Sequence, residues 1–180
     1  MNSTLIRLLS MHALALLLAL VAIATAADQA RVRAILQPAI ERRPAPEFTL
    51  KDSSGETVKL GDYRGRVVLL DFWATWCEGC KEEIPWFSEF QKTNGTKSLA
   101  VMGVSMDEGG WPVVKPFLAE THIPYRILLG DDATAQRYGI QNLPDTFLID
   151  RQGRVAAVYR AGLVDKGNVE ANIKSLISEH

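Results

Sequence analysis

Two cysteines separated by two residues offer the clearest chemistry in this sequence. Cys77 and Cys80 are the only cysteines among the 180 residues, and Glu78 and Gly79 stand between them. They follow an apolar run at residues 67–73 and precede a segment of helical character. The first turn of a helix presents unpaired N–H groups and the positive end of the helix dipole, which together stabilise a thiolate. Because a thiolate is the species that attacks disulfides, this spacing predicts a redox-active dithiol.

A purely structural role for the cysteine pair is the weaker interpretation. The stabilisation that a disulfide gives grows with the loop it encloses, and the loop between Cys77 and Cys80 is very short. A structural zinc site needs four ligands. Besides the two cysteines, the sequence offers only His12, His122 and His180 as nitrogen donors. We therefore expect no metal and no other cofactor.

The elements around the pair follow from hydrophobic patterning. Residues 66–72 are almost continuously apolar and predict a strand buried on both faces. Residues 77–91 predict the helix that carries the cysteines, with a kink at Pro85. Strands and helices then alternate and end in a hairpin and an amphipathic helix: strands at 99–106, 125–129, 146–150 and 155–159, helices at 109–121, 131–138 and 165–178. This order predicts a three-layer α/β domain with a mixed central sheet.

Two shorter features precede the strand that leads to the cysteines. Residues 28–43 are charged and predict a partly helical lead-in, which Pro44 and Pro46 end. Residues 47–50 and 56–60 flank a polar turn and predict a β-hairpin. The central strand is therefore expected to follow a hairpin rather than to open the domain.

Residues 1–26 predict an export signal. One positive charge precedes the Leu/Ala-rich residues 8–23, and residues 24–26 offer a small-x-small cleavage site. An uncleaved membrane anchor is the alternative, because the apolar run is at the lower limit for a membrane span. Either outcome predicts an extracytoplasmic compartment, where disulfides persist. The pattern of the whole chain favours a bacterial periplasm. We divide the chain into this segment, a lead-in at 27–43 and one domain at 44–180.

The composition and the charge indicate which kinds of macromolecule the protein is expected to bind. The formal net charge is −1, and no long run of one sign occurs. A nucleic-acid partner is therefore not expected. About 150 residues follow the predicted signal, which is the size of one domain, and we expect a monomer.

Two separate motifs resemble those of thioredoxin-fold proteins. DFWATWCEGCK at residues 71–81 resembles the active-site segment, and NLPDTFLID at residues 142–150 resembles the cis-proline loop that leads into a strand. The early hairpin and the extra helix and strand at about residues 109–129 resemble the TlpA/ResA-like branch. That branch comprises exported thiol-disulfide oxidoreductases of the thioredoxin superfamily with an AhpC/TSA-redoxin-type domain. The resemblance implies a thioredoxin-like fold with an N-terminal β-hairpin and an αβ insertion before the cis-Pro loop.

The resemblance also implies a role for each cysteine. Cys77 is expected to be the exposed nucleophile, which forms a mixed disulfide with the substrate. Cys80 is expected to be the buried thiol that resolves this mixed disulfide. Pro144 is expected to follow a cis peptide bond, and the backbone of Leu143 is expected to pair with the substrate chain beside Cys77.

Four further residues are expected to support this chemistry. In thioredoxin an acid at the place of Asp71 lies buried beneath the cysteines, where a raised pKa suits a proton acceptor for the resolving thiol. A strand-end carboxylate that faces solvent is the alternative. Glu78 either serves as a favourable first-turn acid or raises the pKa of the Cys77 thiol, which makes the pair more reducing. Trp76 and Gly79 are expected to contribute to the substrate-binding surface.

These features predict an exported oxidoreductase that reduces disulfides of cell-envelope proteins through a cycle of Cys77 and Cys80. By family analogy, apocytochrome c is one candidate substrate, in cytochrome c maturation, and a membrane thiol donor would restore the dithiol. A thiol peroxidase of the AhpC/TSA type is an alternative, although Ala74 and Leu70 stand where its chemistry needs threonine and proline. A disulfide-forming oxidant is another alternative. A non-catalytic binding module is disfavoured because both motifs are intact.

Overall fold

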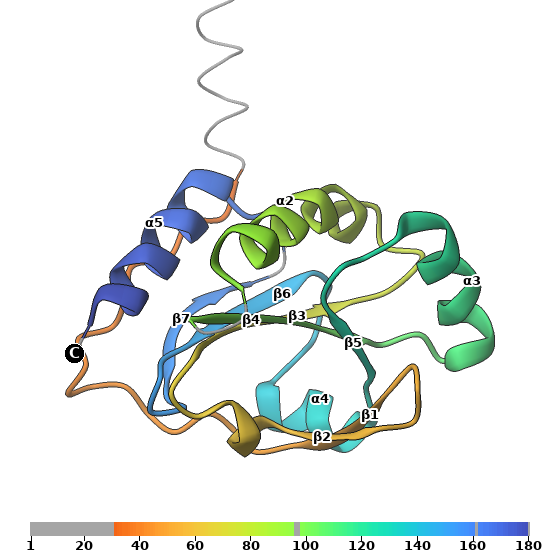
Figure 1. The fold of residues 1–180 in the computed structure, drawn as a ribbon, viewed down its shortest axis with the longest axis horizontal. Helices are drawn as coiled ribbons and strands as arrows, with labels where there is room; N and C mark the ends of the chain where they lie inside the picture. The colour runs from red at the N-terminus through yellow and green to blue at the C-terminus, as the bar shows by residue number, and fades with distance from the viewer. Residues whose placement is uncertain (1–30, 96–97, 161, 180) are drawn as a thin grey trace, which may run out of the picture. The chain divides into compact units, whose positions relative to one another are not determined.

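The apolar run before the cysteines forms an interior strand of a seven-stranded sheet (Figure 1). This strand, β3 (Val67–Trp73), is buried along its whole length, as its uninterrupted apolar pattern predicted. It pairs in parallel with β4 (Leu99–Ser105) and antiparallel with β6 (Asp145–Ile149). The order of the strands is β2-β1-β5-β4-β3-β6-β7. The remaining strands are β1 (Thr49–Asp52), β5 (Arg126–Leu129) and the two edge strands, β2 (Thr57–Lys59) and β7 (Val155–Tyr159).

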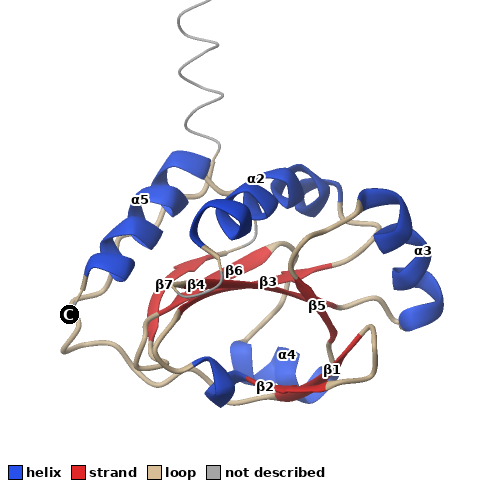
Figure 2. Cartoon of the chain, in the orientation of Figure 1, coloured by secondary structure: helices blue, strands red, loops and turns tan. Residues whose placement is uncertain are grey.

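Helices cover both faces of this sheet (Figure 2). On one face, α2, α3 and α5 share a hydrophobic core with β3 and β4, and on the other face α4 and the short 3-10 helix η1 pack with the β1–β2 hairpin. These helices are α2 (Glu78–Asn94), α3 (Trp111–Thr121), α4 (Asp132–Tyr138), α5 (Lys166–Ser178) and η1 (Leu60–Tyr63). The mixed sheet, the early hairpin and the inserted α3 and β5 confirm the predicted three-layer architecture.

The register of the central strands decides which side chains face α2. Successive side chains of a strand point to opposite faces. Leu69 and Trp73 of β3 belong to the core beneath α2, so Asp71, which has the same parity, also faces α2. Gly103 of β4 stands directly opposite Asp71. The sheet therefore presents a carboxyl group, with a glycine beside it, to the helix that begins at the cysteines.

The lead-in in its described part, residues 31–43, is extended apart from a turn at residues 39–41, and it contains no helix, so the prediction of a partly helical lead-in was wrong. Val32 forms a parallel bridge with Val164, and Pro44 forms an antiparallel bridge with Arg154. Pro38 lies in the middle of the segment and cannot donate a helical hydrogen bond. Hydrogen bonds to the rest of the fold have thus replaced the helix that the composition favoured. Residues from Val32 onward form one compact unit.

The structure describes residues 31–95, 98–160 and 162–179. The predicted signal or anchor at residues 1–26 lies outside these ranges and stays a prediction. Within them, no helix combines the length and the apolar character that a membrane crossing requires.

Candidate active site

Cys77 and Cys80 are joined by a disulfide at the start of α2. Cys77 is the N-cap residue, and its Sγ accepts a hydrogen bond from the backbone N–H of Cys80 at 3.2 Å. That N–H is one of the otherwise unpaired donors of the first turn, so the helix end stabilises negative charge on the leading sulfur. Cys77 is 6% exposed, whereas Cys80 is 0% exposed. Cys77 was predicted to be exposed, but in the disulfide form it is nearly buried; of the two cysteines it is the one that solvent still reaches.

The proline loop lies against the cysteine loop. The peptide bond between Leu143 and Pro144 is cis, as the family resemblance predicted. A methyl group added at Gly79 would lie 3.6 Å from Cδ of Pro144, which is ordinary van der Waals contact. The fold thus brings together two motifs that are far apart in the sequence.

A groove of about 340 Å³ opens beside the cysteines. Most of its lining is apolar, and it comprises Trp76, Met106, Ala135, Ile140, Gln141, Asn142 and Leu143. Trp76 is 67% exposed, although large apolar side chains are mostly buried in this fold. An exposed indole offers a large apolar contact area with a polar edge. The groove therefore places two of the predicted substrate-binding residues, Trp76 and Leu143, next to the nucleophile.

Asp71 is buried, so it is not the solvent-facing carboxylate of the alternative interpretation. Its Oδ1 accepts a hydrogen bond from the Thr146 hydroxyl at 3.1 Å. Burial raises the pKa of Asp71 to about 7; the Thr146 bond opposes this rise and the charge of Asp145 adds to it. A side chain at Gly103, the residue opposite, would approach Nε1 of Trp73 to 2.8 Å. Position 103 therefore has no room for a cationic side chain, which would lower the pKa of Asp71.

Glu83 of α2 is a second buried carboxyl, which the sequence analysis missed. Its Oε1 accepts a hydrogen bond from the Val164 N–H at 2.8 Å, and its buried Oε2 has no hydrogen-bond partner. Glu83 follows Cys80 by three residues, so both lie on the same face of the helix. Burial raises the pKa of Glu83 well above its ordinary value, and the charge of Asp71 raises it further. The sequence signal that could have identified Glu83 is its helical spacing, because Cys80, Glu83 and Ile84 all fall on the buried face of α2.

The two carboxyls influence each other between α2 and the sheet. The charge of Asp71 raises the pKa of Glu83, and both carboxylates add to the effect of burial in raising the pKa of Tyr125. Two like charges in one dry environment oppose each other, so the pair titrates as a unit and ionisation of one acid hinders that of the other. The member of the pair that is ionised can accept a proton close to Cys80.

Comparisons with known proteins agree with this geometry. A family model described as the AhpC/TSA family matches residues 42–158. The chain belongs to the AhpC/TSA family. It is 32% identical over 133 residues to the thiol-disulfide oxidoreductase ResA of Geobacillus thermodenitrificans, with 73% of this chain and 75% of the relative covered. It is 31% identical over 126 residues to the ResA of Bacillus subtilis, with 69% of this chain and 70% of the relative covered.

A solved structure of a thiol:disulfide interchange protein has a similar fold. The protein described as thiol:disulfide interchange protein DsbE from Chlorobium tepidum has a TM-score of 0.71 at 33% identity, with 76% of this chain and 97% of that chain covered. The fold is accordingly thioredoxin-like, and the chain is a ResA-type member of the AhpC/TSA family. It is a thiol-disulfide oxidoreductase with a Cys77–Cys80 disulfide.

In this AhpC/TSA oxidoreductase, Glu78 lies on the surface. Its side chain is 82% exposed, and its Oε1 accepts a hydrogen bond from Nζ of Lys81 at 2.7 Å. As the first residue of α2, Glu78 interacts favourably with the helix dipole. Lys81 offsets part of its charge, so the field of Glu78 at Cys77 is weaker than that of a lone acid. An effect of Glu78 on the Cys77 thiol stays a prediction.

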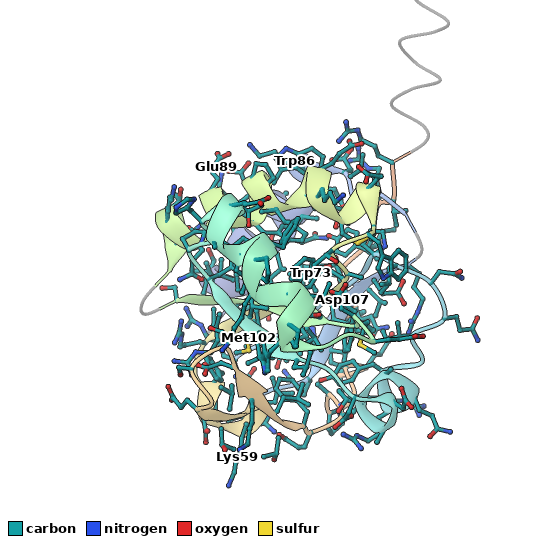
Figure 3. The ribbon with its side chains drawn as sticks, turned by 90° about the vertical axis from the view of Figure 1, so that its right-hand side faces the viewer. Lys59, Trp73, Trp86, Glu89, Met102 and Asp107 are labelled. Carbon is teal, nitrogen blue, oxygen red and sulfur yellow. A yellow bond between two sulfur atoms is a disulfide. The ribbon has the colours of Figure 1, made fainter. Side chains whose placement is uncertain are left out.

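Asp107 anchors the loop that leads to the cysteines, and the sequence analysis did not identify it. Its buried carboxylate accepts hydrogen bonds from the Thr75 hydroxyl at 2.6 Å and the Thr75 N–H at 3.1 Å. The Ser105 hydroxyl at the end of β4 donates a third bond at 2.8 Å. Figure 3 shows Asp107 and Trp73 at this end of the sheet, close to α3. Because Thr75 is two residues before Cys77, these bonds fix the approach to the nucleophile.

Proposed function

We propose that this oxidoreductase works outside the cytoplasm and reduces disulfides of cell-envelope proteins. The observation that carries the reducing direction is the pair of buried carboxyls, Asp71 and Glu83, on the Cys80 side of the helix. A carboxylate near a sulfur disfavours the thiolate and thus the reduced form, which makes the couple more reducing. The signal-like pattern at residues 1–26 supports the extracytoplasmic location.

The reaction begins with the reduced enzyme. The Cys77 thiolate attacks one sulfur of the substrate disulfide, forms a mixed disulfide and releases the first substrate thiolate. The Cys80 thiolate then attacks Sγ of Cys77, closes the Cys77–Cys80 disulfide and releases the second substrate thiolate. The substrate gains two electrons and the enzyme loses two. Cys77 keeps a small exposed fraction and Cys80 has none, which supports this order of attack.

The second step requires Cys80 to lose its proton inside the protein. We assign Asp71 as the acceptor of this proton near neutral pH, and Glu83 as an acceptor at higher pH, where it too is ionised. Asp71 ionises first, because its pKa of about 7 lies lower than that of Glu83. A base whose pKa is near the working pH combines a useful ionised fraction with useful basicity.

The substrate chain is assigned to the surface around Cys77. Trp76 offers an apolar contact in the groove, the backbone of Leu143 pairs with the extended substrate, and Pro144 and Gly79 shape the contact between the two loops. Apocytochrome c with oxidised haem-attachment cysteines is a substrate of suitable chemistry. A membrane thiol donor would reduce the enzyme again after each cycle.

Trapping in cells tests this proposal. The Cys80→Ala variant should accumulate mixed disulfides of envelope proteins on Cys77, whereas Cys77→Ala should accumulate none. Equilibration with glutathione should give a potential of about −200 to −270 mV, the range of reductants, rather than about −120 mV, that of strong oxidants. An oxidising potential, or the absence of adducts on Cys77, would overturn the proposal.

A further inference from the structure

The described start of the lead-in is built into the fold beside the active helix. We call residues 32–37 the strap. The Val32 N–H donates to the Leu163 carbonyl at 2.9 Å, and the Asp165 N–H donates to the Val32 carbonyl at 2.8 Å. The strap therefore pairs with the extended segment between β7 and α5 as a short parallel strand would.

Side-chain amides continue this attachment along α5. The Ala34 N–H donates to Oδ1 of Asn168, and Nδ2 of Asn172 donates to the Ala34 carbonyl, both at 2.9 Å. Nδ2 of Asn172 also donates to the Tyr159 hydroxyl at 2.8 Å. Backbone groups on both sides of residue 33 are thus tied to the fold, so the strap is held at more than one point.

Val164 lies between the strap and the buried carboxyl of Glu83. In an extended segment, successive peptide groups point to opposite sides. The Leu163 carbonyl and the Asp165 N–H point to the strap, whereas the Val164 N–H donates to Oε1 of Glu83 at 2.8 Å. Strap, Val164 and Glu83 consequently form one hydrogen-bonded series that ends close to Cys80.

We propose that the strap is a positioning element of the active site, which holds the Val164 N–H on Oε1 of Glu83 and so favours the ionised form of this acid, the form that can accept the Cys80 proton. The inference rests on the proposed role of Glu83. The groups that act on Glu83 are Asp71 from β3, Tyr125 before β5, Glu82 on its own helix and the Val164 N–H. Burial and the two acids raise the pKa of Glu83, and the Val164 N–H lowers it.

The Gly162→Ala substitution tests the strap directly. A methyl group at Gly162 would lie 2.8 Å from Cγ2 of Val32. Because a β-branched side chain has few rotamers, Val32 must shift and take the strap with it. In the reduced full-length protein mixed with excess oxidised glutathione, we expect the pH midpoint of the Cys80 attack to rise by about one unit, with a rate about ten-fold lower below the midpoint. Adding Val32→Ala removes the clashing methyl group and should restore the original profile.

Matched variants separate the possible outcomes. Ile35→Ala, at a strap side chain that is 92% exposed, should leave the profile unchanged. In a Glu83→Gln background, Gly162→Ala should have no further effect. If Glu83→Gln itself leaves the profile unchanged, the role of Glu83 in the proposed function is wrong.

Failure of the strap inference has a different signature. A Glu83→Gln effect without a Gly162→Ala effect refutes the strap alone, and so does a Gly162→Ala effect that Val32→Ala does not reverse. Should Gly162→Ala fail to fold, Asn168→Ala removes the acceptor of the Ala34 N–H and must shift the profile in the same direction.

Discussion

Asp71→Asn removes a buried ionisable group and keeps the size of the side chain. Burial raises the pKa of Asp71 from an ordinary value of 3.8 to about 7. One pKa unit corresponds to about 1.4 kcal/mol, so ionising Asp71 in the folded protein costs about 4 kcal/mol more than ionising it in the unfolded chain. The asparagine variant does not carry this cost.

The sign of the pH dependence follows from where the proton is held more tightly. The folded state retains the Asp71 proton to a higher pH than the unfolded state does. The contribution of Asp71 to stability is therefore complete below about pH 4 and is lost as the pH rises through about 7. Between about pH 4 and pH 8, the wild type should lose about 4 kcal/mol of unfolding free energy that Asp71→Asn keeps.

Urea unfolding of the oxidised proteins across this pH range measures the difference between wild type and variant. Asp62→Asn, at an exposed acid in η1, is the matched control and should give a flat difference. If the unfolding free energies of wild type and Asp71→Asn changed in parallel with pH, the inference that burial raises the pKa of Asp71 would be refuted. In kinetics, Asp71→Asn should slow the Cys80 attack by roughly 100-fold. Equal rates at all pH values from about 6 to 9 would remove Asp71 from the mechanism.

Three other substitutions give further tests. Thr146→Val removes the hydroxyl that lowers the pKa of Asp71, so the pH–rate midpoint should move upward; a downward shift would contradict the assigned bond. Asp107→Asn weakens the bonds to Thr75 and should lower the unfolding free energy by about 1–3 kcal/mol in urea, whereas an unchanged midpoint would show that these bonds contribute nothing net. Trp76→Ala should raise the KM for insulin more than that for oxidised glutathione, and equal increases would argue against an apolar landing surface.

The parts of the site that the sequence predicted are those encoded locally. The cysteine spacing, the apolar strand that buries Asp71 and the motif around Pro144 each carry their information within a few residues. Glu83 was missed because it follows another glutamate, and two consecutive glutamates usually lie on a solvated surface. Only the spacing of three residues between Cys80 and Glu83 indicates that Glu83 lies on the buried face of the helix.

The structure of the lead-in could not be predicted from local sequence. Its residues favour a helix by composition, yet its amide groups pair with the segment before α5 and with β7, where the Gln37 N–H donates to the Ala156 carbonyl. Those partners lie more than a hundred residues away in the chain. Local patterning does not contain such contacts, so neither the extended strap nor its link to Glu83 could be predicted from it.

The position of Trp76 has a practical consequence. Its indole is largely exposed and directly precedes Cys77, whereas Trp73 is buried in the core. A disulfide quenches the fluorescence of a neighbouring indole, so opening the Cys77–Cys80 bond should brighten the emission of Trp76. The protein thus contains its own optical reporter, with which electron transfer to a partner can be followed in real time without any attached dye.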